Sequence, residues 1–223
     1  MALNKISIKA VIFDMDGVIT NTMPYHYQAW KQVLCDFGIN VTHLDIYARE
    51  GQPGTRCLVE LFEKYGHDYC ENTAQALLAK KEKLFKEIVK ERYIVGARTF
   101  LKKLHCANIR LALVTGTARH EMLKILPIKL QDLFEVVITG NDVKYGKPHP
   151  EPYQKAIAKL KVSAESAVVI ENAPFGVQSA LGAGLRCFAL ETSLPAQYLN
   201  EATKIFKSIK HMNNDIRFNL CTK

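Results

Sequence analysis

The stretch that most constrains the fold of this chain is residues 10–20, which read AVIFDMDGVIT. Its first four residues form an uninterrupted apolar run, which is typical of a strand buried on both faces of a parallel sheet. Gly17 follows soon after and allows the chain to turn sharply as it leaves the sheet. Open α/β sheets bind ligands at the carboxyl ends of their strands, so we expect Asp14 and Asp16 to lie in a binding site.

The two aspartates of this stretch lie one residue apart and cannot both stay ionised without help. Either a cation neutralises them, or one carboxyl holds a proton that the other lacks. A calcium loop does not fit, because Val18 and Ile19 follow Asp16 and Tyr25 stands where the terminal Glu of such a loop belongs. A solvated turn after a strand remains the simpler alternative on this stretch alone.

Beyond residue 96 the chain alternates short apolar runs with helical segments. This alternation predicts an α/β fold, a Rossmann-like doubly wound parallel sheet with helices on both faces. The expected strands span 109–116, which ends in a small polar turn, and 134–140, 167–171 and 185–190. The expected helices span 97–106, 118–125, 151–160 and 174–183.

The intervening segment, residues 22–93, contains no pattern typical of a strand. It contains a helix that begins near Pro24 and stops at Gly38, followed by expected helices over 53–65 and 71–92. We therefore expect two domains, a core made of residues 1–21 and 94–223 and a helical insertion, 22–93, that closes over the carboxyl edge of the sheet.

The composition is that of an ordinary globular protein of 223 residues with a formal net charge of +8. Its positive residues are spread along the chain without an aromatic-interleaved basic block, so a small phosphorylated partner explains the charge as well as nucleic acid does; a merely basic surface is the alternative. Of these we expect the small phosphorylated metabolite and no nucleic-acid partner. Six cysteines form no CxxC pair, and no run resembles a signal peptide or reaches transmembrane length. We expect a cytoplasmic protein without membrane partners, monomeric or weakly dimeric.

Polar residues follow the other expected strands as well. Thr115 and the Gly116 amide come after the second strand, Glu171 and Asn172 come at the end of the fourth, and the proline-rich loop 144–150 aims Lys147. Together, acidic side chains, a hydroxyl with a free amide and a lysine are the groups needed for one reaction. They can hold Mg²⁺ against a phosphate group, and one of the acids can attack the phosphorus.

With these motifs the chain resembles the haloacid dehalogenase superfamily over essentially its full length. The resemblance depends on four motifs in order, namely FDMDGV at 13–18, LVTG at 113–116, GKP at 146–148, and VIEN at 169–172 followed by Gly176 and Val177. The helical insertion resembles the small α-helical cap of that superfamily.

The resemblance implies roles for the first two motifs. Asp14 would be the nucleophile that forms an aspartyl-phosphate, and Asp16 the general acid that later serves as base for water. Thr115 and Gly116 would hold the phosphate oxygens. Because the dehalogenases of the superfamily lack an acid at the position of Asp16, phosphate-ester chemistry is favoured.

The resemblance also implies roles for the last two motifs. Lys147 would balance the charge of the nucleophile and the transferring group. Glu171 and Asn172, with Asp14 and the Asp16 carbonyl, would form the Mg²⁺ site. The metal motif commonly ends in Glu-Asp, so Asn172 removes one negative charge, which we interpret as tuning of the site; a degraded site would look the same.

Candidate substrate residues in the cap are less specific. Residues 25–30 resemble a cap helix of the β-phosphoglucomutases, in which a histidine helps control proton transfer; otherwise His26 only shares an apolar face. Lys81 falls within an apolar stripe and either reaches a substrate anion or extends its ammonium group to water. Arg56 and Arg119 are weaker candidates of the same kind.

The leading functional hypothesis is a Mg²⁺-dependent phosphatase of a small sugar or polyol phosphate. The first alternative is a β-phosphoglucomutase-like isomerase, which shares the core chemistry and returns the phosphoryl group to the sugar. A further alternative is a receiver or a phospho-metabolite sensor without turnover. Receivers, however, do not place their acceptor aspartate on the first strand, and they lack a helical insertion of this kind.

Overall fold

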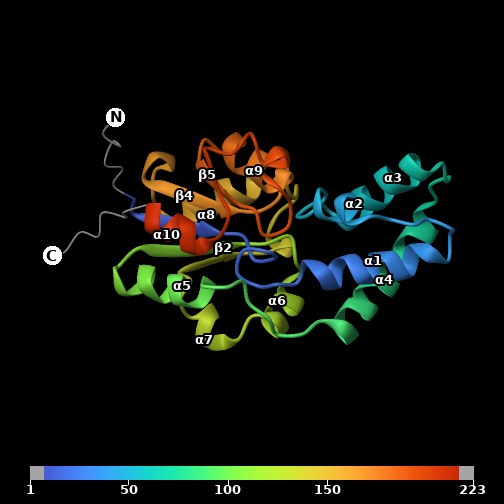
Figure 1. Cartoon of the computed structure of the whole chain (residues 1–223), viewed down its shortest axis with the longest axis horizontal. Coiled ribbons are helices and arrows are strands. Elements are labelled where there is room, and N and C mark those ends of the chain that lie inside the picture. The colour runs from blue at the N-terminus through green and yellow to red at the C-terminus, as the bar shows by residue number, and fades with distance from the viewer. Residues whose placement is uncertain (1–7, 216–223) are drawn as a thin grey trace.

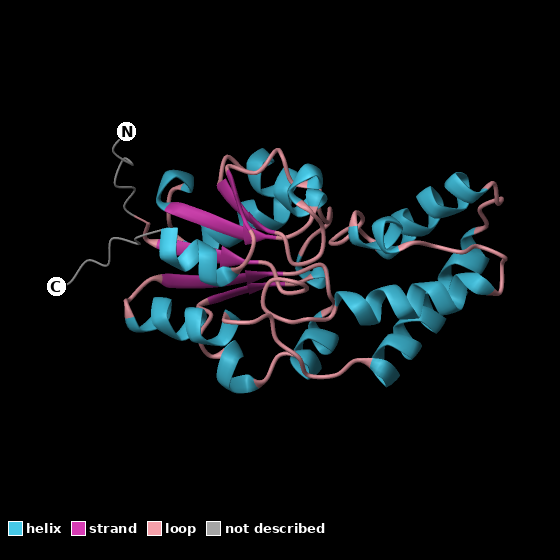
Figure 2. Ribbon diagram, in the orientation of Figure 1, coloured by secondary structure: helices cyan, strands magenta, loops and turns pink. Residues whose placement is uncertain are grey.

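The computed structural model describes residues 8–215, which form a sheet-containing lobe and a lobe of helices (Figures 1 and 2). Within these residues six parallel strands form one sheet in the order β3-β2-β1-β4-β5-β6. The strands are β1 (Ala10–Phe13), β2 (Arg110–Val114), β3 (Val136–Ile138), β4 (Ala167–Glu171), β5 (Arg186–Leu190) and β6 (Lys204–Phe206). The predicted Rossmann-like α/β fold is confirmed.

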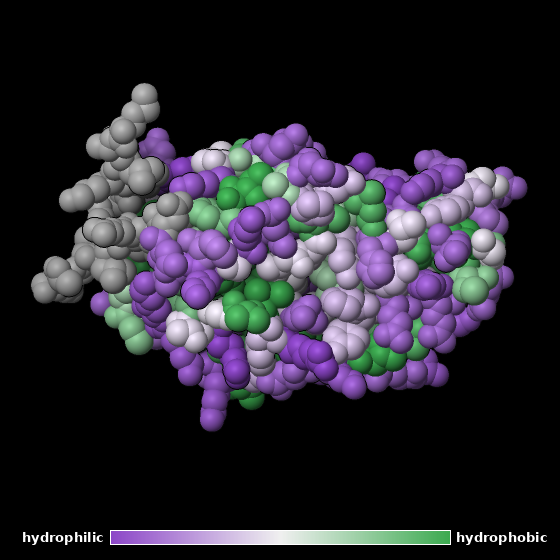
Figure 3. Space-filling model, in the orientation of Figure 1, coloured by the Kyte–Doolittle hydropathy of each residue, from purple (hydrophilic) through white to green (hydrophobic). Residues whose placement is uncertain are grey.

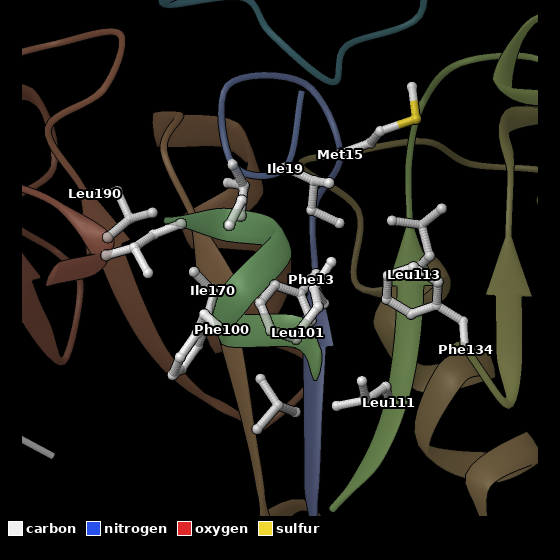
Figure 4. Packing of buried hydrophobic residues seen from close by; sticks show 14 of the residues in the cluster. Phe13, Met15, Ile19, Phe100, Leu101, Leu111, Leu113, Phe134, Ile170 and Leu190 are labelled. Carbon is white, nitrogen blue, oxygen red and sulfur yellow. The ribbon is translucent and has the colours of Figure 1, made fainter. Parts of the chain in front are cut away.

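Helices cover both faces of the sheet because successive side chains of a strand point to opposite sides. Val11 and Phe13 of β1 pack on one face, and Ala10 and Ile12 pack on the other. The first face is covered by α5 (Ala97–Cys106), α6 (Arg119–Ile125), α7 (Ile128–Gln131) and α10 (Ile209–Asp215), and the second by α8 (Glu151–Leu160) and α9 (Pro174–Gly182). Figure 4 shows Phe13 packed between Phe100 of α5 and the side chains of β2.

The helical lobe contains α1 (Met23–Cys35), α2 (His43–Tyr47), α3 (Gly54–Tyr65) and α4 (Glu71–Ile88). It has its own apolar cluster, in which Trp30, Leu34, Leu58 and Phe62 are buried. Figure 1 shows this lobe beyond the carboxyl ends of the strands, on the side away from both termini. Such a core of its own lets the lobe pack as one unit.

Two connections join the lobes, and they are hydrogen-bonded to each other. The amide of Asn21 donates to the carbonyl of Arg92, the amide of Ile94 donates to the carbonyl of Ile19, and Thr20 forms an antiparallel bridge with Tyr93. This pairing requires extended backbone, so α4 ends at Ile88. The prediction that this helix extends to residue 92 was wrong, whereas the elements between residues 22 and 93 are all helices, as expected.

Other differences are at short elements. The third strand is shorter than predicted, and β6, α2, α7 and α10 were not predicted. Each of these four has seven residues or fewer, too few for a periodic pattern to stand out.

Hydrophilic residues cover most of the face in view in Figure 3, where apolar residues form small separate areas. No helix in the described part of the chain is both long and apolar enough to cross a membrane.

Candidate active site

The site lies where three neighbouring strands end at one edge of the sheet. Because β2, β1 and β4 are adjacent, the residues that follow them are adjacent too. Asp14 follows β1, Thr115 follows β2, and Glu171 is the last residue of β4. The site residues predicted from these strands are thus brought together by the parallel topology.

Lys147 lies at the centre of a buried ion cluster. Its Nζ is 2.6 Å from Asp14 Oδ1 and 2.7 Å from Glu171 Oε1, and it also donates to the carbonyl of Val114 at 3.3 Å. The Lys147 side chain is only 2% exposed. The hydroxyl of Tyr153 on α8 donates to the same Glu171 oxygen at 2.8 Å, a contact that the sequence analysis missed. These contacts hold the nucleophile candidate Asp14 in one position.

The charges of this cluster shift one another's pKa. Burial alone lowers the pKa of Lys147, but the adjacent Asp14 and Glu171 carboxylates raise it above its usual value. Burial raises the pKa of Asp14 to about 8, against the opposing Lys147 ammonium, and the Glu171 and Asp16 carboxylates add to the rise. A further cation beside Asp14 would favour its ionised form at neutral pH.

Gly176 near the start of α9 has a steric role in this cluster. A Cβ at this position would be 1.8 Å from Glu171 Oε1, so a larger residue would displace the carboxylate. The glycine of the fourth motif therefore lets α9 approach the acid that pairs with Lys147.

Two of the four predicted ligands have a side-chain oxygen that is free to hold Mg²⁺. Asp14 Oδ2 and Asn172 Oδ1 are buried and without a hydrogen-bond partner, and carboxylate and amide oxygens are ligands suited to Mg²⁺. Both oxygens of Glu171 accept hydrogen bonds, Oε2 from the backbone amides of Asn172 and Ala173. Within residues 8–215 no three His, Cys, Asp or Glu side chains converge as a ready metal cage. The donor set thus fits Mg²⁺ through Asp14 and Asn172, while Glu171 is engaged by Lys147.

Asp16 is surrounded by hydroxyl groups. Its Oδ1 accepts from Thr22, and its Oδ2 accepts from Thr117 at 3.0 Å and from Thr115 at 3.4 Å. Burial would raise the pKa of Asp16, but His26 and the Thr22 and Thr117 hydroxyls together lower it. Thr22 and Thr117 were missed, because a threonine beside a motif has no spacing signal that marks it.

His26 of α1 faces the site from the helical lobe. Its Nε2 is 3.6 Å from Asp16 Oδ1, its ring stacks on Phe85 at 4.0 Å, and its Nδ1 is 3.1 Å from Lys81 Nζ. Burial and Lys81 lower the pKa of His26, against the opposing effect of Asp16. Because an ammonium group only donates, a neutral His26 accepts from Lys81 at Nδ1 and presents its Nε2–H to Asp16.

Lys81 of α4 is directed into the site rather than toward water. Its ammonium lies 5.4 Å from the Trp30 ring centroid and 5.1 Å from that of Phe85, and the side chain lines the cavity between the lobes. Burial lowers its pKa, while Glu121 and Asp16 oppose that change.

A second contact between the lobes involves Glu50, a residue the sequence analysis did not select. Asn172 Nδ2 donates to Glu50 Oε2 at 2.9 Å and to Ser193 Oγ at 2.8 Å. Burial raises the pKa of Glu50 well above its usual value, and the carboxylates of Asp14 and Asp16 add to the rise. The Asn172 amide nitrogen therefore donates to the helical lobe, while its amide oxygen is left free as a candidate Mg²⁺ ligand.

Arg56 and Arg119, the two weaker candidates, lie elsewhere. The side chain of Arg56 is 59% exposed and pairs with Glu60, and that of Arg119 is 44% exposed and pairs with Asp142. Neither is among the residues that line the cavities at this edge of the sheet. Arg49 lines the cavity instead.

The cavity between the lobes has a volume of about 210 Å³. The core contributes Asp14, Asp16 and Thr117, and the helical lobe contributes the side chains already described together with apolar groups. A neighbouring cavity of about 240 Å³ is lined by Thr115 and Lys147.

A family model described as haloacid dehalogenase-like hydrolase matches residues 11–190. The chain belongs to this family. The predicted family membership and the prediction of a hydrolase are confirmed.

Individual relatives are similar over most of their length. A phosphorylated carbohydrates phosphatase from Thermotoga maritima is 35% identical over 185 residues, 80% of this chain and 82% of that protein. A beta-phosphoglucomutase from Bacillus subtilis is 29% identical over 185 residues, 80% of this chain and 81% of that protein. A solved beta-phosphoglucomutase from Clostridium difficile superposes with a TM-score of 0.79 at 25% identity, covering 95% of this chain and 94% of that one.

Proposed function

We propose that this hydrolase is a Mg²⁺-dependent phosphatase of a small phosphorylated metabolite, a sugar or polyol phosphate. The observation that supports the proposal most strongly is the fixed Asp14 carboxylate, with one oxygen held by Lys147 and the other buried without a partner. A phosphate group needs a nucleophile of this kind together with positive charge beside it.

In the proposed reaction an oxygen of Asp14 attacks phosphorus and the bond from phosphorus to the leaving oxygen breaks. Asp16 gives that oxygen a proton. The same carboxylate then takes a proton from water, whose oxygen attacks the aspartyl-phosphate and releases Asp14. A phosphate dianion beside Asp16 opposes its ionised form, so the ester favours the protonated acid that the first step needs.

The positive and hydrogen-bonding groups around the phosphate have separate tasks in this proposal. Lys147 neutralises Asp14 and the transferring group, and the Thr115 hydroxyl with the Gly116 amide binds phosphate oxygens. Asp14 and Asn172 would hold Mg²⁺, the ion general to this family, which when bound offsets the negative charge of the phosphate.

The substrate class follows from the cavity and the relatives. A volume of about 210 Å³ lies below the ~300–1,000 Å³ of typical ligand pockets, which favours a small ester. The Thermotoga maritima relative is a phosphatase of phosphorylated carbohydrates. We further propose that residues 22–93 form the cap that covers the ester, since they supply His26, Lys81 and Glu50 to the cavity.

A phosphomutase is the second candidate function. It is supported by the approach of His26 to Asp16 and by the similarity to beta-phosphoglucomutases. The two functions differ only in whether water or a sugar hydroxyl receives the phosphoryl group.

The test is release of inorganic phosphate from a panel of esters, with Mg²⁺ and with EDTA. The panel contains glucose 6-phosphate, fructose 1-phosphate, glycerol 3-phosphate, AMP and inorganic pyrophosphate. We expect Mg²⁺-dependent release that falls by about 10³-fold or more in Asp14→Asn, as when other enzymes lose a nucleophile. Interconversion of glucose 1-phosphate and glucose 6-phosphate without release would establish the mutase instead, and no turnover in either assay would contradict both functions.

A further inference from the structure

Two threonines two residues apart face different parts of the site. The Thr117 hydroxyl donates to Asp16 Oδ2 at 3.0 Å, whereas the Thr115 hydroxyl is 3.4 Å from the same oxygen. Thr115 Oγ1 also accepts the backbone amide of Thr117 at 3.1 Å. Thr117 therefore makes the shorter contact with Asp16.

The two threonines also line different cavities. Thr117 lines the cavity between the lobes together with Asp16 and His26. Thr115 lines the neighbouring cavity together with Lys147, whose ammonium holds Asp14. Thr117 thus shares a cavity with Asp14 and Asp16, while Thr115 lies beside Lys147 in the neighbouring cavity.

We propose that Thr117 is a positioning residue that orients the general acid Asp16 toward the leaving oxygen, while Thr115 binds the phosphate. This inference rests on the proposed phosphatase function. Asp16 has two fixed hydroxyl donors, Thr22 on Oδ1 and Thr117 on Oδ2, so the plane of the carboxyl group is held from both sides. When an ester draws the Thr115 hydroxyl to its phosphate, Thr117 remains to hold Oδ2.

The inference predicts a dependence on the leaving group. An alkoxide needs a proton as it leaves, but p-nitrophenolate is stable as an anion, so in the first step a misplaced acid harms only the sugar ester. The second step, in which Asp16 takes a proton from water, is common to both esters, so the readout is kcat/KM, which reports the reaction only up to departure of the leaving group. For Thr117→Val we expect kcat/KM for a sugar phosphate of the panel to fall by about 10–100-fold, part of the 10²–10⁴-fold that a general acid contributes. The kcat/KM for p-nitrophenyl phosphate should fall by about 3-fold or less.

Two further variants separate this role from others. Thr117→Ser keeps the hydroxyl and should restore kcat/KM for the sugar phosphate to within about 3-fold of the wild type. Thr115→Val is the matched control and should impair both esters, because it removes a phosphate ligand. Equal losses for both esters in Thr117→Val, or no recovery in Thr117→Ser, would overturn the inference. A wild-type protein that hydrolyses neither ester would instead contradict the proposed function.

Discussion

The core edge and the facing surface of the helical lobe are built in different ways. At the core edge Asp14 and Glu171 are buried at the ends of strands, and Lys147, from the loop before α8, contacts both at 2.6–2.7 Å. Across the cavity, the helical lobe reaches the core through single contacts, such as His26 with Asp16 at 3.6 Å and Glu50 with Asn172 at 2.9 Å. The ion cluster is thus held within the core, whereas the helical lobe contacts it through separate side chains.

Substitution of Lys147 tests the buried ion cluster of the core edge most directly. Lys147→Met leaves Asp14 and Glu171 as buried carboxylates without their cation. We expect phosphate release to fall by about 10²–10³-fold and the free energy of unfolding to fall by about 3–5 kcal/mol. Phosphate assays and urea unfolding measure the two effects.

A lysine that joins the two lobes provides the control for this variant. Lys86 of α4 pairs with Glu121 of α6 at 3.1 Å and is 36% exposed. Lys86→Met should lower the free energy of unfolding by about 1 kcal/mol or less, as is usual for an exposed ion pair. If both variants lower the free energy of unfolding by similar amounts, the ion cluster at the core edge stabilises the fold no more than the ion pair between the lobes does.

The contact between the lobes can be tested at Asn172. Asn172→Asp replaces the donor to Glu50 with a second carboxylate. The repulsion should raise KM by about 10-fold or more. The added negative charge should at the same time lower the Mg²⁺ concentration needed for half-maximal activity. Kinetics at a series of Mg²⁺ concentrations measure both.

The double variant Glu50→Gln, Asn172→Asp restores a donor and an acceptor with their positions exchanged. It should recover most of the loss in KM, because an amide again faces a carboxylate. If KM does not change in Asn172→Asp, the Glu50 contact has no part in substrate binding.

The smallest effect concerns the helical lobe itself. Asp45 of α2 is 2% exposed and accepts hydrogen bonds from Thr42, Lys64 and Tyr65. Burial would raise its pKa, but these donors lower it below the usual value. The ionised carboxylate therefore adds stability above the unfolded-state pKa of about 3.9, and this stability is lost as the pH falls toward the folded-state pKa.

We expect Asp45→Asn to lower the free energy of unfolding by about 2 kcal/mol at pH 7, a difference that shrinks in urea titrations at pH 3. Asp36→Asn, whose exposed carboxylate pairs with Lys80, is the matched control and should change little at either pH. A difference for Asp45→Asn that stays constant between the two pH values would contradict this account of its pKa.

The sequence by itself determined the α/β sheet, the helical insertion and the residues at the strand ends. Buried parallel strands are continuous apolar runs, so residues 10–13 and 110–114 could be recognised, and the residue after each strand must lie at the same edge. For this reason Asp14, Thr115 and Glu171 were correctly placed together, and Lys147 joined them because its loop leads to that edge.

Only the tertiary structure decided which side chains face this edge from elsewhere. Glu50, Thr117 and Tyr153 reach the site through loop geometry and helix packing, which leave no periodic signal in the sequence. The sequence analysis selected Arg56 and not Arg49. Both arginines pair with Glu60, but Arg49 lines the cavity and Arg56 does not. Strand ends are positioned by hydrogen bonds of the sheet, whereas the position of a side chain of the helical lobe depends on how two separately packed lobes meet.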